Sequence, residues 1–169
     1  QYLTRTPGSA GNRKTWTWSG WLKRASSSAS NKHSFYGAYG GSHETSSTLT
    51  YDNSTDDVLR FEDDFINGDL GGKTPAVFRD FGGGWYHVVI SLDTTKSSVT
   101  DGLKIYVNGT QQTGLTGTIW NQNHDSNINS TVAQYLGSDT TAANRFFDGM
   151  MSQVYLIDGL ALGPENFGF

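Results

Sequence analysis

The ten residues Thr15-Trp-Thr-Trp-Ser-Gly-Trp-Leu-Lys-Arg24 decide the fold of this chain. Their side chains alternate with a period of two, and successive side chains of a β-strand point to opposite faces. Trp16, Trp18 and Leu22 share one face, whereas Trp21 lies on the other. The stretch therefore predicts a long strand with a ring-rich inner face and an outer tryptophan that needs cover.

The same period recurs along the chain, most strongly at 85–92, where both faces are apolar and a central strand is predicted. Asn108-Gly109 is the strongest short hairpin signal, because both central positions of such a turn need positive φ. A hairpin is also predicted for 47–51 and 58–62, and residues 63–74 are predicted to form a loop. The other predicted strands are 33–39, 76–81, 103–107, 110–113, 132–137 and 146–157.

Composition agrees with many short strands joined by turns. The 169 residues include 21 Gly and 3 Pro, and aromatic residues make up 13%. No stretch has helical periodicity, and we expect a single domain over residues 1–169. About twelve strands without helices leave a sandwich or a barrel, and the irregular spacing favours an all-β sandwich of two antiparallel sheets.

Charge and cysteine content exclude several function classes. The net charge of -4 gives no general attraction for nucleic acid or anionic membranes, and no apolar run is long enough for membrane insertion. The absence of cysteine excludes thiol catalysis and cysteine-zinc sites. The first residues lack an initiator Met and the apolar core of a signal peptide, so we expect a processed chain or part of a longer one.

Four blocks resemble the concanavalin A-like family of laminin G-like and pentraxin-like domains, and they occur in the family's order. They are 18–24, the central strand 84–93, the hairpin 102–109, and the closing strand 147–159 with its tail 162–167. The resemblance implies a jelly-roll sandwich whose loops or concave face bind glycans or proteins. Since this fold hosts both lectins and glucanases, function has to be argued from the site.

A narrower resemblance concerns Arg5-Thr-Pro-Gly-Ser-Ala-Gly-Asn-Arg-Lys-Thr-Trp-Thr-Trp18 and Tyr155-Leu-Ile-Asp-Gly159. These stretches are similar to the version of the domain in virion proteins of tailed bacteriophages, where it occurs in capsid decoration proteins and in fibres. The resemblance implies a location on the virion surface. The implied partners are capsid or fibre proteins, further copies of this chain, and cell-surface glycans.

A glycosidase needs two carboxyl groups held across the scissile bond, and Glu62-Asp63-Asp64 is the nearest candidate. We interpret this run as a solvated strand end, with a cation site or a catalytic pair as the alternatives. His87 alternates with Trp85 and Val89, which favours a hydrogen-bonded structural histidine over a general base. We therefore expect no catalytic residues.

A sugar site pairs an aromatic platform with amide and carboxylate groups, and the irregular stretch 119–125 contains these residue types. The ring of Trp120 can stack on a sugar, while neighbouring side chains bind hydroxyl groups; the candidates are Trp120, Asn121, Asn123, His124 and Asp125. The alternative is that Trp120 plugs the end of the sandwich. A second candidate region is 34–43, where ordinary sheet packing is the alternative for Tyr36, Tyr39 and His43.

Calcium is the candidate cofactor, since it takes six to eight oxygen ligands and two stretches are rich in oxygen donors. These are 52–57 and 121–129, with Asp52, Asp56, Asp57 and Asp125 as candidate ligands. The alternative is turn chemistry, in which Asp and Asn side chains accept hydrogen bonds from nearby backbone amides.

The leading hypothesis is thus a non-enzymatic binding or structural module of a phage virion, in a capsid decoration or fibre protein, that binds glycans. The alternative is a secreted or cell-surface adhesion module with calcium-dependent carbohydrate binding. A glycoside hydrolase of the same fold ranks third.

Overall fold

The computed structural model describes residues 1–26, 32–42, 45–52, 57–63, 70–117, 121–139 and 145–168. In these ranges nearly all of the regular secondary structure is strand, and no helix has the length and apolar character needed to cross a membrane. The elements are β1 (Leu3–Arg5), β2 (Thr15–Arg24), β3 (Lys32–Tyr39), β4 (Ser46–Asp52), β5 (Val58–Asp63), β6 (Leu70–Val77), β7 (Tyr86–Asp93), α1 (Val99–Gly102), β8 (Leu103–Val107), β9 (Thr110–Gln111), β10 (Ala133–Leu136), β11 (Gly149–Asp158) and a final 3-10 helix (Pro164–Phe167).

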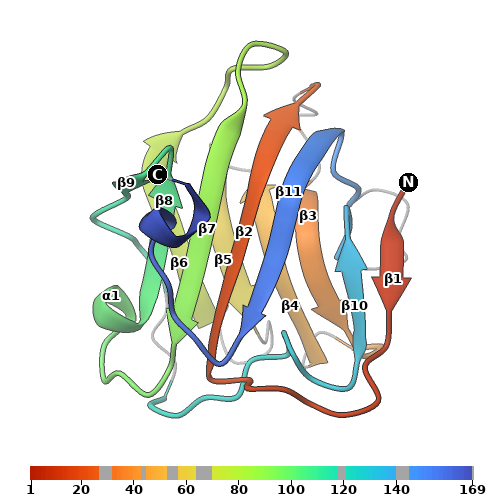
Figure 1. Ribbon diagram of the computed structural model, residues 1–169, viewed down its shortest axis with the longest axis vertical. Helices are drawn as coiled ribbons and strands as arrows, with labels where there is room; N and C mark the ends of the chain where they lie inside the picture. Colours follow the sequence, from red (N-terminus) through yellow and green to blue (C-terminus); the bar gives the residue numbers. More distant parts are fainter. Residues whose placement is uncertain are drawn as a thin grey trace.

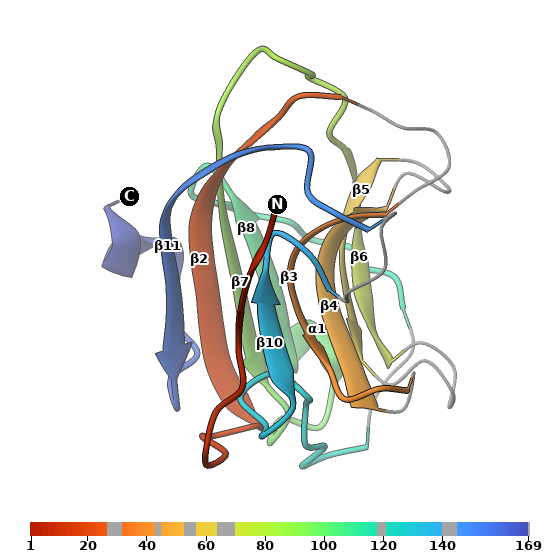
Figure 2. The ribbon, with the colours of Figure 1, turned by 90° about the vertical axis from the view of Figure 1, so that its right-hand side faces the viewer.

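The strands form two stacked antiparallel sheets, which confirms the predicted jelly-roll sandwich (Figures 1 and 2). One sheet has six strands in the order β1-β10-β3-β4-β5-β6, and the other has five in the order β11-β2-β7-β8-β9. The first and last strands of the chain, β1 and β11, are therefore outermost in different sheets.

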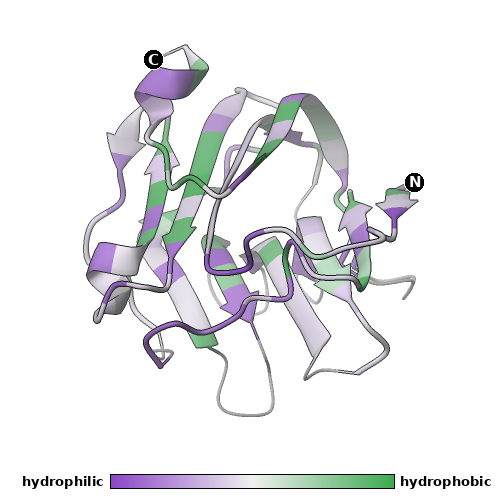
Figure 3. Ribbon diagram, turned by 60° about the horizontal axis from the view of Figure 1, so that its bottom comes forward, coloured by the Kyte–Doolittle hydropathy of each residue, from purple (hydrophilic) through white to green (hydrophobic). Residues whose placement is uncertain are grey.

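The inner face of β2 forms the centre of the core. Trp16, Trp18 and Leu22 have no exposed surface, as the alternation predicted. The Trp16 ring lies 5.4 Å from Phe61, edge to face, and the Trp18 ring lies 4.8 Å from Phe35. Since both phenylalanines belong to the opposite sheet, these ring pairs hold the two layers together. Figure 3 shows the same alternation as hydrophobic and hydrophilic bands along the strands.

The outer face of β2 is covered by the C-terminal tail, which lies beyond the five-stranded sheet in Figure 2. The Thr17 hydroxyl donates to the Leu160 carbonyl at 2.7 Å and accepts a bond from the Leu162 amide at 2.8 Å. The outward Trp21 ring packs against His87 at 5.1 Å, and His87 hydrogen-bonds to the buried Ser19 hydroxyl at 3.0 Å. The tail and these contacts give the outer face the cover that the sequence requires.

Local turn chemistry was predicted well. Asn108 and Gly109 have φ values of 49° and 78°, as the tight hairpin between β8 and β9 requires. The pairing of β4 with β5 confirms the second predicted hairpin. The return strand β9 covers only Thr110–Gln111, and the closing strand begins at Gly149 rather than at residue 146.

The prediction for residues 63–81 was wrong. Strand β6 spans Leu70–Val77, within a stretch predicted to be mostly loop, and no strand continues to residue 81. Gly71 has a φ of 137°, and a Cβ there would lie 2.1 Å from the Phe61 carbonyl oxygen. Glycine is therefore required for close approach of β6 to β5, although glycine by itself indicates a loop. The short strand β1 was also missed.

One end of the sandwich is closed by Arg24, the last residue of β2, which is 1% exposed. Its guanidinium lies between the rings of Tyr51 and Phe81, at 4.6 and 4.7 Å from their centroids. It donates to the Phe78 carbonyl at 2.7 Å and to the Asp57 carboxylate at 3.1 Å. A single side chain thus joins both sheets and the segment after β6 at this end.

We predict that Arg24→Leu destabilises the protein by about 3 kcal/mol, because it removes the guanidinium donor of the buried Phe78 carbonyl and the cation beside the Tyr51 and Phe81 rings. Urea unfolding followed by tryptophan fluorescence measures the change. Arg79→Gln is the matched control, since Arg79 pairs with the same Asp57 carboxylate at 3.1 Å from a side chain that is 62% exposed. The control costs less than about 1 kcal/mol; equal losses in the two variants contradict the buried role of Arg24.

His33 on β3 generates a pH-dependent prediction. Its side chain is buried, and neither ring nitrogen hydrogen-bonds within the described chain. Burial, with the nearby Arg24 charge, lowers the pKa of His33 below its usual value of 6.5. The unfolded chain therefore binds the proton at a higher pH than the folded chain does, so stability falls as the pH drops below about 6.5.

We predict that His33→Met weakens this loss of stability between pH 7 and pH 5. The slope decreases without vanishing, because burial also lowers the pKa of His87. Melting temperatures at half-unit pH intervals measure it, and an unchanged slope in the variant would show that His33 does not contribute.

Candidate functional site

Residues 121–125, the described part of the loop predicted as a sugar site, lie at the other end of the sandwich and are bonded to it. His124 turns inward, with Nε2 2.9 Å from the fully buried Asp63 carboxylate. The Thr94 hydroxyl donates to the His124 carbonyl at 2.7 Å, and the Asn123 amide donates to the Thr94 carbonyl at 2.7 Å. The Ser47 hydroxyl and the Asn127 side chain also donate to Asp63. Inward packing of His124 thus closes this end.

The remaining predicted sugar ligands do not converge with His124. Asn121, Asn123 and Asp125 are exposed, and the Asp125 carbonyl accepts a bond from the Arg13 guanidinium at 3.0 Å. Trp120 lies outside the described residues. The loop therefore remains a predicted sugar site. Of its described candidate ligands, His124 is the one whose side chain has a structural contact, with Asp63.

Glu62 and Asp63, at the end of β5, are buried and not solvated, contrary to the prediction for the acidic run. Glu62 is 1% exposed and lies between Lys32 at 2.5 Å and Arg60 at 2.7 Å. Asp63 has no exposed surface and faces the interior, because adjacent strand residues point to opposite faces. Glu62 and Asp63 therefore do not face each other across a common space. Asp64 lies outside the described residues.

Two of the candidate calcium ligands are paired with arginine side chains. Asp52 pairs with Arg60 at 2.9 Å, and Asp57 pairs with Arg24 and Arg79. Asp56 lies outside the described residues, and Asp125 is exposed in the loop after residue 120. Across the described ranges, no three acidic or histidine side chains gather as metal ligands would.

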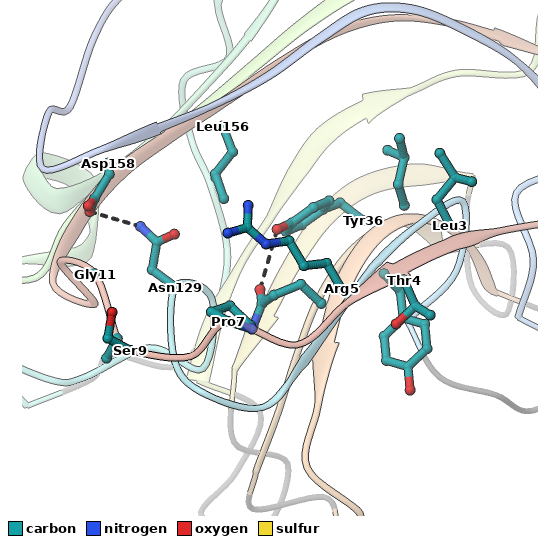
Figure 4. Close-up of a pocket in the computed structure, with 14 residues that line it drawn as sticks. Leu3, Thr4, Arg5, Pro7, Ser9, Gly11, Tyr36, Asn129, Leu156 and Asp158 are labelled. Carbon is teal, nitrogen blue, oxygen red and sulfur yellow. Dashed lines mark hydrogen bonds between the residues drawn. The ribbon is translucent and has the colours of Figure 1, made fainter.

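A cleft of about 490 Å³ opens on one lateral side of the sandwich, between the β1–β10 edge and β11. Figure 2 faces this side of the molecule, and Figure 4 shows the cleft in detail. The opposite side is closed, because the backbone of Thr116 pairs with Lys73 of β6 at 2.8 and 3.0 Å. Strands β1 and β11 form no such bridge with each other, although the Phe147 amide donates to the Gly137 carbonyl at 3.0 Å where the chain leaves β10 and approaches β11. The volume of the cleft suits a small organic ligand.

Strand register places the walls of the cleft. Arg5 pairs with Gln134 and Leu3 with Leu136, on the face of the sheet that also carries the core residue Ala38. On the other sheet, Leu156 and Asp158 lie opposite the buried Trp18 and Trp16. These residues therefore occupy inward-facing positions at the edges of both sheets, where core side chains stand elsewhere in the molecule.

The floor of the cleft is a junction of three segments at Asn129, which has a φ of 65°. Its side-chain amide donates to the Asp158 carboxylate at 3.1 Å and to the Asn12 carbonyl at 3.2 Å. The Asn12 amide also donates to Asp158, at 2.7 Å. A Cβ at Gly11 would lie 2.7 Å from the Asp158 carboxylate, so glycine leaves room for the acid.

Tyr36 and Gln134 supply the buried polar groups of the wall. The Tyr36 hydroxyl donates to the Gln134 side-chain carbonyl at 3.3 Å, and the Gln134 amide nitrogen donates to the carbonyls of Asn127 and Val132. Burial raises the pKa of Tyr36 to about 12, partly offset by the nearby Arg5 charge. Tyr36 is therefore neutral at physiological pH, and its oxygen can still accept a hydrogen bond from a ligand.

Among the residues that line the cleft, Tyr36 belongs to the second candidate region, whose His43 lies outside the described residues. Asn129 lies in the oxygen-rich stretch 121–129 but was not a candidate ligand, and Arg5, Gln134 and Asp158 were not predicted as site residues. The only local signal for Arg5 is its alternation with Leu3, which is too short to define a strand.

A second hollow, of about 430 Å³, lies on the outer face of the five-stranded sheet, and its charged residues include Lys96 and Asp93, which pair at 3.8 Å.

Comparisons with solved structures support the same fold at low identity. The heptameric SAP-like pentraxin of Limulus polyphemus matches with a TM-score of 0.64 and 14% identity, over 96% of this chain and 72% of the pentraxin. The Ruminococcus gnavus IT-sialidase CBM40, bound to α2,3-sialyllactose, matches with a TM-score of 0.60 and 14% identity, over 97% of this chain and 95% of that domain.

The enzymatically active domain of bacteriophage CBA120 tailspike protein 2 matches with a TM-score of 0.61 and 14% identity. The match covers 97% of this chain but only 25% of the tailspike chain. No curated protein matches the sequence significantly. The Laminin_G_3 family, described as the concanavalin A-like lectin/glucanases superfamily, matches residues 1–166, so this chain belongs to that family.

Proposed function

We propose that this chain is a non-enzymatic carbohydrate-binding module and that its ligand binds in the cleft between β1 and β11. The observation that carries the proposal is the composition of the cleft. It is sugar-sized, and it combines apolar walls at Leu3, Leu136 and Leu156 with hydrogen-bonding groups at Asp158 and Tyr36. Carbohydrate sites need both, because a sugar ring has apolar faces and a rim of hydroxyl groups.

Binding without catalysis is supported by the small number of carboxylic acids among the described residues that line the cleft. Asp158 is the one carboxylic acid among the described residues that line it. Hydrolysis of a glycosidic bond by the usual mechanisms requires a pair of carboxyl groups about 5 to 9.5 Å apart. Asp158 alone can accept hydrogen bonds from sugar hydroxyls, but it has no partner to serve as the second acid or nucleophile.

The setting that we propose is the surface of a phage particle, as part of a capsid decoration or fibre protein. The stretch 5–18, which resembles phage virion proteins, also supplies Arg5, Pro7 and Gly11 to the wall of the cleft. The shared fold of a tailspike domain is compatible with this setting. Genes for portal and capsid proteins beside the gene for this chain would support it, and their absence from the gene's neighbourhood would count against it.

We predict that Ala10→Trp abolishes glycan binding, because Ala10 is exposed on the rim and a tryptophan there fills the cleft. Binding is screened on an array of bacterial and animal cell-surface oligosaccharides and measured by calorimetry. Asp158→Asn weakens binding about tenfold, because an amide replaces a charged acceptor of hydroxyl protons while keeping the shape of the side chain.

Ala161→Trp is the matched control, since Ala161 is exposed and lines the second hollow. This variant retains wild-type affinity. Absence of binding by the wild-type protein across the array, or equal losses in both tryptophan variants, contradicts the proposed function.

A further inference from the structure

Arg5 is the one arginine whose guanidinium has no bonding partner in the described part of the chain. Each of the other five donates to a carboxylate or a backbone carbonyl: Arg13 to Ser126, Arg24 to Phe78, Arg60 to Asp52, Arg79 to Asp57 and Arg145 to Asp139. Its cross-strand neighbour Gln134 directs its side chain to Tyr36 and to backbone carbonyls instead. The donors of Arg5 are therefore free for a ligand.

The guanidinium also points into the cleft. Arg5 occupies an inward-facing position of β1, and Figure 4 shows its side chain extending into the space between Asn129 and Tyr36. The effect of its charge on the Tyr36 hydroxyl agrees with this placement. The Arg5 side chain is itself exposed, so its positive charge lies beside the Leu3 and Leu136 side chains where a ligand that enters the cleft from water can reach it.

Asp158 gives the cleft a second charge, on the opposite wall. Arg5 and Asp158 do not pair with each other, and both described hydrogen bonds to the Asp158 carboxylate go to Oδ1. Oδ2 accepts no hydrogen bond within the described chain and is available to hydroxyl groups. The cleft thus has a positive charge on one wall and a negative charge on the other, with Asn129 beside Asp158 and Tyr36 beside Arg5 (Figure 4).

We propose that the cleft selects acidic sugars and that Arg5 binds the ligand's carboxylate; this inference rests on the proposed function. The planar guanidinium donates two parallel hydrogen bonds to a carboxylate, a geometry that a hydroxyl group cannot match. The sugar hydroxyls donate to Asp158, and the ring lies against Leu3, Leu136 and Leu156. Because Asp158 repels a second negative charge, a sugar with a single carboxylate fits better than a doubly charged phosphate ester.

An inward charge on an edge strand has one other established use, which is to prevent edge-to-edge association. In that case Arg5 affects the oligomeric state and leaves the choice of ligand unchanged. Ligand selection and edge protection therefore predict different effects of Arg5→Gln, one on the preference among ligands and the other on the oligomeric state. Both properties can be measured on the same sample.

The test uses oligosaccharides ending in glucuronate, galacturonate or N-acetylneuraminate, each beside its carboxyl-reduced counterpart, with galactose 6-phosphate as a further probe. Calorimetry at low and high salt gives the affinities for the full chain. We expect at least one acidic probe to bind at least tenfold more tightly than its reduced counterpart and than galactose 6-phosphate. We expect Arg5→Gln to bring that ratio to within twofold of one, and Arg5→Lys to give an intermediate ratio.

Lys104→Gln is the matched control, because it removes the same charge from a residue that lines the second hollow. It leaves the ratio unchanged, and melting temperatures verify that all variants fold. Equal affinity for acidic and reduced probes, or equal effects of the Arg5 and Lys104 variants, overturns the inference while glycan binding stands. Dimerisation of Arg5→Gln with an unchanged ratio assigns Arg5 to edge protection, and binding of no glycan at all overturns both proposals.

Discussion

Trp16 and Trp18 of β2 pack against Phe61 and Phe35 of the opposite sheet, and the rest of the molecule is arranged around these ring contacts. They lie near the middle of a close-packed layer, where no water is available to charged groups. Between the two sheets, charged side chains therefore lie only at the margins of the described core. Arg24 closes one end through Asp57 and the Phe78 carbonyl, and His124 closes the other through Asp63.

The two lateral sides differ in a way that creates the cleft. On one side, backbone hydrogen bonds between Lys73 and Thr116 connect the edge of the six-stranded sheet to the chain beyond β9. On the other side, β1 and β11 are the outermost strands of their sheets and do not pair with each other. Inward-facing positions on these two strands carry Arg5 and Asp158 in place of core residues. At this lateral side, a family fold that serves many functions thus has the cleft that we propose as the binding site.

The elements that sequence predicted best are those whose signal is contained within a few neighbouring residues. The alternation of 15–24 and the Asn108-Gly109 turn are local, since each depends on the geometry of one strand or one turn. Strand β6 was missed because Gly71 is needed for a close approach to β5, which is a property of the pair of strands. The acidic Glu62 and Asp63 were interpreted as solvated because nothing local shows that Lys32 and His124 reach them.

The sequence by itself determined the fold class, the ring-rich core, the hairpins and the resemblance to a lectin-like family. Only the tertiary structure decided where a ligand could bind, because Arg5 and Asp158 lie near opposite ends of the chain and in different sheets. Which residues face each other across a sandwich depends on how two complete sheets stack and on which edges stay unpaired. That arrangement results from packing over the whole domain, and no periodicity along a single strand encodes it.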